Sequence, residues 1–595
     1  MKKDLAVGGD VFADMVRMNS YYVDKTLYIK SVIRPTGRVV LVTRPRRFGK
    51  TLFLDTIKSF LAIDPEKPGD RSRNEVLFAG MKILEDRAFC DEYMGQFPVV
   101  SMTLKDAHGD SFANAYDHFV SNIQDVALDF AFLAESPKLL PAEKLRFGQY
   151  LKPTVISNPL NRHLAQDFLK NLVMCLSKHY GRQVVVLIDE YDVPLAKAAK
   201  NGYYREMLEL CRSFLSQVLK PRPNSGSDSF AYVRKVVLTG CLRVSKESIF
   251  TGVNNLAVDS VCTENQELSK AIGFTAEEVR DLLAYYELSD RSEDVEHWYD
   301  GYRLYKTEIF CPWDVINFCR DAMDSGEPRT FSARNYWAGT SSNDVIEEFL
   351  GFLAGDDTEK MQTLLDGGVI EISVNDNLNY DQFSGHRPAD FWTLLLFTGY
   401  LTVVEKVPGQ ISTYRVRIPN EEIRQTFRSN VLEHFSNSNS SFATFGVRFA
   451  RAAIAGDADT LTEVLTEVLE GFVSVRDAAT RAAPENFYQG LLVALCACSG
   501  GLIRNFRSQP ESGEGYADIA FTSAGVADRV GVVMELKHCS HGDLFDSARS
   551  ALDQIKGKHY DEYLDRALSK KKLAYGIAFR GRLCLVLKDG FTSQK

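Results

Sequence analysis

The sequence predicts an α/β protein of several domains, and three observations carry this prediction. An apolar run, a tight basic loop and a helical pattern follow one another between residues 38 and 60. A second apolar run ends in two carboxylates at residues 189 and 190, and a third, near the C-terminus, ends in an acid and a lysine at residues 535 and 537. Because single cores stop growing near about 250–300 residues, a chain of 595 residues is expected to divide into domains.

The first element reads as a strand, a loop and a helix. Residues 38–43 are apolar and β-branched, and apolar residues recur at helical spacing after residue 51. In this context Gly49 allows close backbone approach to a phosphate, and the helix N-terminus offers unpaired N–H groups. Lys50 can reach the β- and γ-phosphates, and the Thr51 hydroxyl can ligate Mg²⁺. The stretch therefore indicates a phosphate-binding loop.

The loop departs from the usual G-x-x-x-x-G-K-[ST] pattern, because Arg44 occupies the first glycine position. On spacing alone, a basic loop before an ordinary helix is the alternative interpretation. The remaining loop residues are expected to help bind the cofactor together with Gly49, Lys50 and Thr51; they are Arg44, Arg46, Arg47 and Phe48.

The second element is the run from Gln183 to Glu190, five apolar residues followed by two acids. Such a run is typical of a parallel strand buried on both faces, and its acids then lie where open α/β sheets bind ligands. Asp189 is expected to hold Mg²⁺ through water, and Glu190 to polarise an attacking water. A strand that ends in Asp-Glu is common, but together with Gly-Lys-Thr upstream it favours an ATP site.

Seven motifs are spread along the chain: Tyr21–Thr26, Arg44–Thr51, Leu187–Pro194, Leu238–Lys246, Asn254–Leu256, Trp298–Tyr302 and Phe397–Leu401. As a set they resemble the bacterial AAA-ATPase-like family, whose members often carry a C-terminal domain of the PD-(D/E)XK nuclease superfamily. The arginine at the first loop position belongs to that family's pattern. The resemblance implies a P-loop AAA-type ATPase domain.

The resemblance also suggests roles for two further segments. In AAA-type ATPases the strand after the acidic one ends in a residue that senses the γ-phosphate, and Thr239 or Arg243 could do so here; a plain strand-to-loop exit is the alternative. Residues 21–26 are a candidate for the base pocket, and a helix cap provided by Asp24 is the competing interpretation.

The middle of the chain is predicted to be mostly helical. Thr275 and Glu278 have the spacing of a capping box, and residues 392–418 suggest helix, strand, turn and strand, as in a winged-helix unit. We expect an ATPase domain at 1–275, a helical lid with a winged-helix-like region at 276–440, a helical spacer at 441–472 and a nuclease-like α/β domain at 473–595.

The C-terminal segment contains the spacing D-x16-E-x-K, formed by Asp518, Glu535 and Lys537. With a period of two, Glu535 and Lys537 project from one face of a strand, where two carboxylates can hold Mg²⁺ or Mn²⁺ and the lysine can stabilise charge on a phosphate. This pattern resembles the restriction-endonuclease-like core of PD-(D/E)XK nucleases. The resemblance implies that Gln554 is the superfamily's helix glutamine and Glu485 its acidic residue on the first helix.

Composition narrows the cellular context. The chain is 45% hydrophobic with a net charge of −9, so it has no global attraction to nucleic acid, although a local basic groove is compatible with this charge. Eleven cysteines without a C-x-x-C pair indicate no disulfide framework and fit a reducing cytoplasm. No apolar stretch is long enough to span a membrane, and no signal peptide is expected.

These features favour an ATP-binding, ATP-hydrolysing module fused to a metal-dependent DNA endonuclease whose cleavage is gated by nucleotide state. DNA is the expected partner, and a homo-oligomer could form through the ATPase domain. Such an architecture suits genome defence or the control of mobile elements. The alternative is a nucleotide-dependent sensor or scaffold that binds protein or nucleic acid and carries an inactive nuclease fold. The presence of Asp518, Glu535 and Lys537 favours the enzyme.

Overall fold

In the computed structural model of this protein, the chain folds into two compact units. The first unit contains Met1–Ser342 and Val369–Thr426, and the second contains Asn343–Gly368 and Phe427–Lys595. The structure describes all residues except 1, 35–36, 221–228, 243–248, 251–252, 264–266, 305, 338–359, 362, 365–366, 376–377, 379–387, 428–439, 473–487, 490, 493–494, 497–498, 500, 509–510, 513–514, 526–528, 540–541, 559, 561–563, 565–568 and 591–595.

The first unit is built on a five-stranded parallel sheet in the order β2-β3-β4-β1-β5. Its strands are β1 (Val39–Thr43), β2 (Val99–Thr103), β3 (Val184–Asp189), β4 (Val233–Gly240) and β5 (Leu256–Asp259). The order inserts β4 between β1 and β3, and the register pairs Thr43 with Gly240 and Ile188 with Leu238. The carboxyl ends of these three strands therefore lie at one edge, where open α/β sheets bind ligands.

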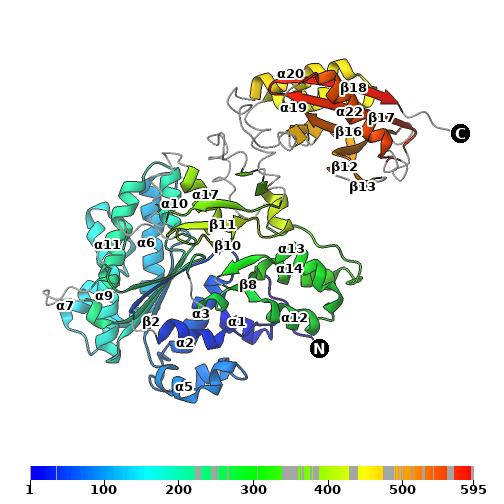
Figure 1. The fold of residues 1–595 in the computed structure, drawn as a ribbon. Helices are drawn as coiled ribbons and strands as arrows, with labels where there is room; N and C mark the ends of the chain where they lie inside the picture. The colour runs from blue at the N-terminus through cyan, green and yellow to red at the C-terminus, as the bar shows by residue number, and fades with distance from the viewer. Residues whose placement is uncertain are drawn as a thin grey trace. The chain divides into compact units, whose positions relative to one another are not determined.

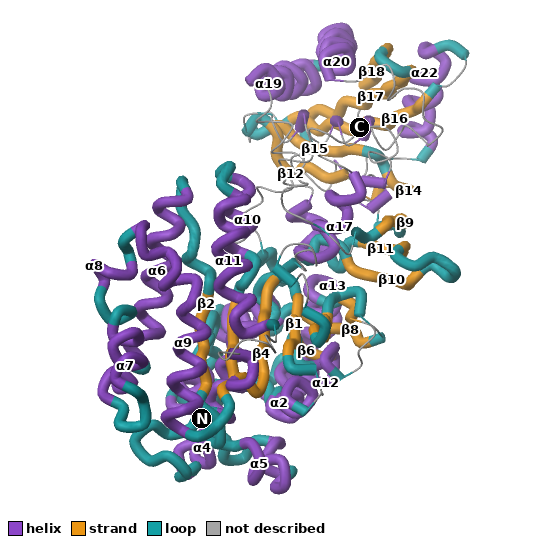
Figure 2. Tube along the Cα trace, turned by 90° about the vertical axis from the view of Figure 1, so that its left-hand side faces the viewer, coloured by secondary structure: helices purple, strands orange, loops and turns teal. Residues whose placement is uncertain are grey.

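Helices cover both faces of this sheet, as the views in Figures 1 and 2 show. One face packs against α6 (Phe112–Asp129), α9 (Arg162–Tyr180) and α11 (Tyr204–Leu219), and the helix α3 (Lys50–Leu61) contacts β2, β3 and β4. Burial on both faces explains why β1 and β3 are continuous apolar runs. The shorter helices are α1 (Phe12–Arg17), α2 (Ile29–Ile33), α4 (Ser72–Leu77), α5 (Arg87–Tyr93), α7 (Pro141–Gly148), α8 (Pro153–Ile156) and α10 (Val193–Lys200).

The rest of the first unit combines helices with two small antiparallel sheets, β6-β8-β7 and β10-β11-β9. The elements are β6 (Phe274–Thr275), α12 (Ala276–Tyr285), α13 (Ser292–Tyr299), β7 (Tyr302–Leu304), β8 (Thr307–Phe310), α14 (Pro312–Asp324), β9 (Ile370–Ser373), α17 (Pro388–Thr398), β10 (Thr402–Lys406) and β11 (Thr413–Arg417). The capping box is confirmed, since Thr275 and Glu278 cap the start of α12 reciprocally. The predicted helix, strand, turn and strand are also confirmed as α17, β10 and β11, whereas β9 was not foreseen.

The second unit contains a mixed sheet in the order β12-β15-β16-β17-β18, in which only β16 and β17 run parallel among the described strands. The sheet consists of β12 (Ile503–Ser508), β15 (Ile519–Ser523), β16 (Val530–His538), β17 (Lys571–Arg580) and β18 (Leu583–Gly590), beside a hairpin of β13 (Glu511–Ser512) and β14 (Gly515–Tyr516). The helix α22 (Leu544–Gly557) packs very closely on β17, because a Cβ at Gly576 would lie 2.1 Å from the Ala548 carbonyl oxygen.

The predicted helical spacer at 441–472 forms two helices that belong to the core of this unit. Apolar side chains of α19 (Ser440–Ala455) and α20 (Ala458–Phe472) pack with buried residues of β16 and β17. The Tyr575 hydroxyl donates a hydrogen bond of 2.7 Å to the Ala453 carbonyl oxygen. The predicted helices are confirmed, and both bury their apolar faces against the nearest apolar sheet face, as amphipathic helices do.

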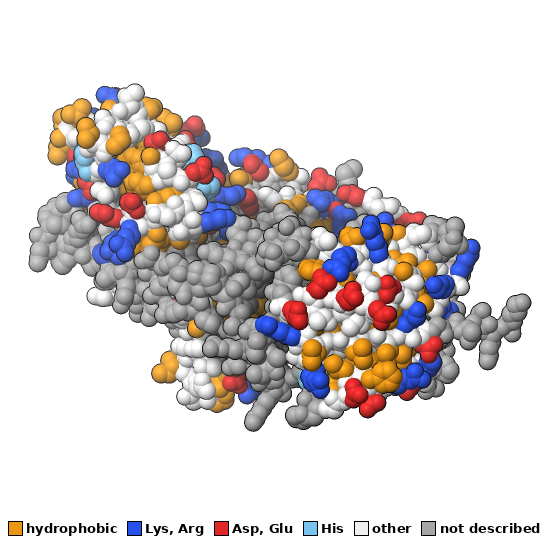
Figure 3. Space-filling model, turned by 90° about the horizontal axis from the view of Figure 1, so that it is seen from above, with side chains coloured by type: hydrophobic (Ala, Val, Ile, Leu, Met, Phe, Trp, Pro, Cys, Tyr) orange, Lys and Arg blue, Asp and Glu red, His pale blue; other side chains and the backbone are white. Residues whose placement is uncertain are grey.

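The described surface, cysteines and helices add three observations. On the face shown in Figure 3, basic and acidic side chains are interspersed among the residues drawn in colour, without a broad field of one sign. The ten described cysteines are free. Within the described residues, no helix is both long enough and apolar enough to cross a membrane.

Candidate functional sites

The phosphate-binding loop connects β1 to α3 at the carboxyl edge of the first sheet. Gly49 precedes the helix with a left-handed backbone (φ 87°), which glycine adopts without strain and which turns the chain sharply into α3. The Lys50 side chain is buried, and its ammonium group donates hydrogen bonds to the carbonyl oxygens of Arg44 (3.1 Å) and Pro45 (2.9 Å). The lysine ammonium group thus lies against the backbone of the loop that precedes α3.

Asp189 links the loop to two neighbouring strands. The Thr51 hydroxyl donates to Oδ2 of Asp189 at 2.5 Å, and the Thr239 hydroxyl donates to Oδ1. Thr239 reaches this carboxylate because β4 lies between β1 and β3. Thr239 does not line the cavity. It orients Asp189, which accepts a hydrogen bond from the Thr51 hydroxyl, the group expected to ligate Mg²⁺.

Glu190 follows Asp189 and adopts a left-handed backbone (φ 51°), which is uncommon for a residue with a Cβ. This turn brings its side chain to the same cavity as Lys50. Burial raises the pKa of the Glu190 carboxyl, and the positive charge of Lys50 opposes the rise. A half-buried carboxylate with a raised pKa is suited to accept a proton from a positioned water.

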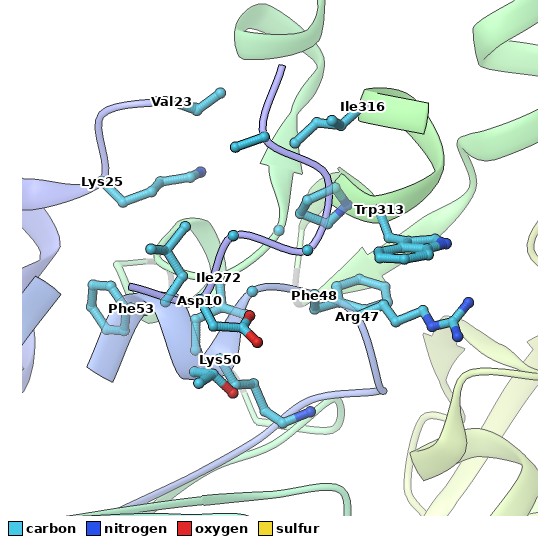
Figure 4. A pocket seen from close by; sticks show the side chains of 18 of the residues that line it. Asp10, Val23, Lys25, Arg47, Phe48, Lys50, Phe53, Ile272, Trp313 and Ile316 are labelled. Atoms are coloured by element: carbon cyan, nitrogen blue, oxygen red, sulfur yellow. The ribbon is translucent and has the colours of Figure 1, made fainter. Parts of the chain in front are cut away.

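A cavity of about 490 Å³ opens beside the loop. Figure 4 shows Lys50 and Asp10 on one side of it and Phe48, Trp313 and Ile316 on another. The end of the cavity next to the loop is lined by Gly49–Thr51 and by the acids at 189 and 190, and the other end is mostly apolar. The apolar end is formed by three segments distant in the chain, which are residues 6–9, 21–23 and 271–274, together with Pro312, Trp313 and Ile316.

The other predicted cofactor-binding residues occupy different places. Arg47 and Phe48 line the cavity, whereas Arg44 and Arg46 do not lie on its wall. The Arg44 side chain is 1% exposed and forms an ion pair with Asp259 at the end of β5, which gives it a structural role in the loop. Arg243 lies outside the described residues.

The residues of the segment Tyr21–Thr26 lie in two different surroundings. Tyr21, Tyr22 and Val23 line the cavity. Asp24 instead accepts hydrogen bonds from the backbone N–H and the hydroxyl of Thr26 (2.9 and 2.6 Å), which orders the start of the following helical turn. Residues 21–23 thus stay a candidate for the base pocket, and Asp24 has a local structural role.

The second unit brings four of the five predicted nuclease residues together. Asp518 precedes β15, and its Oδ2 accepts the backbone N–H of Leu536 at 2.8 Å, which places it beside Glu535. Lys537 lies 3.5 Å from Oε1 of Glu535, as expected for two residues on one face of β16. The Gln554 amide on α22 donates to the same Oε1.

The Glu535 carboxyl is buried, and its second oxygen, Oε2, has no hydrogen-bond partner among the described residues. Burial, helped by the nearby Asp518, raises the pKa of Glu535 to about 7, and Lys537 opposes the rise. A buried carboxylate oxygen without a donor is costly, and a hard divalent cation would satisfy it, since such ions prefer carboxylate oxygens. The residues present therefore fit a divalent cation held by Asp518 and Glu535.

Sequence reasoning missed two neighbours of this site. Gln489 donates a hydrogen bond of 3.2 Å to the Asp518 carbonyl oxygen, and the Tyr560 hydroxyl lies 3.5 Å from the Gln554 amide. Gln489 is four residues after the predicted Glu485, which lies outside the described residues. No cluster of three or more His, Cys, Asp or Glu side chains with metal-binding geometry occurs where the structure is described.

In the first unit, sequence reasoning missed residues 6–9 and Trp313 as cavity walls. Neither carries a motif: the first is a small-residue segment, and the second was one of many aromatics in a helical stretch. A tryptophan directly after a proline at a helix start was the available signal, and it is a weak one.

Comparison with known proteins agrees with this division. Residues 6–250 match the family described as Predicted AAA-ATPase, and residues 483–588 match the PD-(D/E)XK nuclease superfamily. A curated protein of Azotobacter chroococcum mcd 1, named "Uncharacterized protein in vnfD 5'region", is 26% identical over 442 residues, which cover 72% of this chain and 70% of that protein. The chain is therefore similar to AAA-ATPase-like proteins in its N-terminal part and to the PD-(D/E)XK nuclease superfamily near its C-terminus.

Proposed function

We propose that this chain is an ATP-binding and ATP-hydrolysing protein whose C-terminal domain cleaves DNA with the help of a divalent cation, and that nucleotide state gates the cleavage. One observation carries the proposal most directly: Asp518, Lys537 and Gln554 lie around the buried Glu535 carboxyl, whose Oε1 accepts from Lys537 and Gln554 and whose Oε2 lacks a donor. The intact Gly-Lys-Thr loop with its Asp-Glu strand supports the nucleotide half.

At the nucleotide site, each group has a separate task. Lys50 would exchange its loop carbonyl partners for phosphate oxygens, which are stronger partners because they are charged. Thr51 and Asp189 would hold Mg²⁺, and Glu190 would accept a proton from the attacking water. The apolar end of the cavity, with Tyr22 and Trp313 among its walls, suits a purine base.

At the nuclease site, Asp518 and Glu535 would hold Mg²⁺ or Mn²⁺. Bound there, the cation would lower the pKa of a water molecule and polarise the phosphodiester. Lys537, about one-third exposed, can approach a phosphate and stabilise the charge that develops on it. Gln554 fixes Oε1 of Glu535 and so leaves Oε2 for the cation.

The partner we propose is DNA, with assembly into a homo-oligomer through the ATPase domain as a further element. We place the activity in the cytoplasm, in agreement with the cysteine content, and connect it with genome defence or the control of mobile elements, as the joined domains suggest. The boundaries at 275, 440 and 472 remain part of the proposal, although the helices at 441–472 pack with the C-terminal domain.

The test is cleavage of single-stranded, duplex and branched DNA by the full chain and by three single variants, with Mg²⁺ or Mn²⁺. Asp518→Ala and Glu535→Ala should lose both cation binding and cleavage. Lys537→Ala should keep cation binding and cut about 10²–10³-fold more slowly, because its contribution is made in the transition state. Variants that cut as well as the wild type would place the activity elsewhere, and a wild type that cuts no DNA would favour the sensor or scaffold.

A further inference from the structure

Arg47 of the phosphate-binding loop is held by residues that follow the parallel sheet in the chain. Its guanidinium lies over the Trp313 ring at 4.7 Å, and Nη1 donates to the Tyr336 carbonyl oxygen at 3.3 Å. The Cys311 thiol donates to the Arg47 carbonyl oxygen at 3.7 Å. The backbone of Arg47 is left-handed (φ 70°), a conformation that a non-glycine residue keeps only when its surroundings enforce it. Figure 4 shows the side chain extending past Trp313 and away from Lys50.

Two buried carboxyl groups, those of Asp314 and Glu422, lie near enough to Arg47 for their charge to oppose the lowering of its pKa by burial. Asp314 is in the first turn of α14, Glu422 is in a helix that includes residues 421–427, and both are 0% exposed. Oε1 of Glu422 accepts the backbone N–H groups of Tyr336 and Trp337. Both oxygens of Asp314 and Oε2 of Glu422 meet no N–H donor among the described residues.

Two facing buried carboxyl groups that lack donors can both be satisfied if one of them carries a proton and donates it to the other. Burial raises the pKa of both groups, and repulsion by Asp314 raises that of Glu422 further, so Glu422 keeps the proton and Asp314 the charge. Tyr299, Tyr302 and Cys311, which also face the pair, have pKa values raised by burial and stay neutral. Arg47 is joined to this pair through Tyr336, whose carbonyl oxygen accepts from the guanidinium and whose N–H donates to Glu422. Its positive charge also lowers the pKa of Asp314, against the rise caused by burial.

Glu422, one member of this pair, also joins the two segments by which the chain leaves the first unit. The Asn335 amide donates to the Glu422 carbonyl oxygen (3.0 Å) and to the Thr426 hydroxyl (2.8 Å), in addition to the two bonds that Glu422 accepts. The chain passes out of this unit after Ser342 and again after Thr426. Residues 335–337 and 421–426 thus form one hydrogen-bonded clasp next to both exits.

We propose that the Asp314–Glu422 pair is a positioning element that restrains Arg47 away from the bound phosphates, so that nucleotide binding draws Arg47 off the clasp and loosens both exits toward the nuclease-bearing unit. This inference rests on the proposed nucleotide site and names its regulation. Arg47 lines the same cavity as Lys50 and Thr51, so a triphosphate and the acid pair compete for one guanidinium. The contact of Arg47 with the pair and its contact with the nucleotide are coupled, and such coupling is reciprocal. A change that weakens the first contact should therefore strengthen nucleotide binding by the same factor.

Two substitutions separate the charge of the pair from its shape. Glu422→Gln copies the protonated glutamate: its amide oxygen accepts the two backbone N–H groups and its NH₂ group donates to Asp314. The charge on Asp314 remains, so nucleotide affinity should stay within about twofold of the wild type. Asp314→Asn combined with Glu422→Gln removes the charge while keeping two hydrogen-bonding groups of the same size.

The experiment measures the affinity of a non-hydrolysable ATP analogue by calorimetry in the full chain. The double variant should bind about fivefold more tightly than Glu422→Gln, the lower end of usual coupling. The same pair of changes made in an Arg47→Ala background should leave the affinity unaltered, because the group that transmits the effect is gone. Equal affinities for Glu422→Gln and the double variant, or the same gain without Arg47, would overturn the proposal.

The wild type provides a second readout that needs no substitution. Saturation with the analogue should speed amide hydrogen exchange at Tyr336 and Trp337, whose N–H groups Glu422 accepts, and Arg47→Ala should abolish that change. Unchanged or slower exchange at these two amides would contradict the proposal even if affinities shift. If the wild type binds no analogue, as expected of Lys50→Ala, the nucleotide site itself is refuted. If the wild type, Glu422→Gln and the double variant bind the analogue equally well, only the restraint on Arg47 is refuted.

Discussion

The shared proton of Asp314 and Glu422 predicts how the stability of the first unit depends on pH. Because the pKa of Glu422 is raised in the folded state, the folded unit keeps a proton that the unfolded chain releases above the ordinary glutamate pKa. Its contribution to stability is therefore complete at low pH and is lost as the pH rises toward the raised value. Glu422→Gln removes this titration without removing the hydrogen bonds.

The size of the effect follows from one proton. Each pH unit through which folded and unfolded states differ by one bound proton changes the free energy of unfolding by about 1.4 kcal/mol. Between about pH 6 and about pH 8, the wild type should lose about 3 kcal/mol more stability than Glu422→Gln. Titrating groups outside the Asp314–Glu422 pair contribute equally to both proteins and cancel in the difference.

Tryptophan fluorescence makes this measurement specific to the first unit. The four tryptophans lie at positions 298, 313, 337 and 392, all within that unit. Urea unfolding at several pH values, followed by this fluorescence, gives the free energy of unfolding for the wild type and for Glu422→Gln. The matched control is Glu421→Gln, which changes the preceding residue, a glutamate paired with Arg424. It should keep the wild-type dependence of the free energy of unfolding on pH. Equal slopes for the wild type and Glu422→Gln would refute the shared proton.

Three further outcomes are expected. Arg44→Ala should destabilise the first unit by about 3–5 kcal/mol, because it leaves Asp259 buried without its ion-pair partner; an unchanged urea midpoint would contradict the structural role given to Arg44. Gln554→Ala should weaken Mn²⁺ binding and slow cleavage by about 10–100-fold, since it removes the group that orients Glu535, and calorimetry with Mn²⁺ measures the first effect. Glu190→Gln should bind ATP as the wild type does and lose turnover, which phosphate release measures; wild-type turnover would remove Glu190 from the role of base.

Motifs that are contiguous in the chain were predictable because their geometry is local. A strand, a glycine turn and a helix start fix the loop from Gly49 to Thr51 within a few residues, and the strand before Glu190 is equally self-contained. The alternation along β16 likewise places Glu535 and Lys537 on one face. These elements depend on backbone periodicity, which the order of apolar and polar residues in the sequence indicates directly.

Features that depend on side-chain direction or on distant partners were not predictable. Arg44 looked like a phosphate ligand, but its partner Asp259 comes from a strand far along the chain, and no local pattern reveals it. Trp313 was one aromatic among many until folding placed it on the cavity wall. The pairing of Asp314 with Glu422 needs two helices brought together by the fold, so neither residue stood out in the sequence.

The measurement that tests the central claim most directly is DNA cleavage by the full chain with Mg²⁺, with and without ATP, beside Lys50→Ala and Glu535→Ala. The account predicts that the wild type cuts DNA at a rate that changes with ATP, that Lys50→Ala cuts at a rate that ATP does not alter, and that Glu535→Ala does not cut in either condition. Cleavage by Glu535→Ala at the wild-type rate, or an ATP effect that survives in Lys50→Ala, would contradict it.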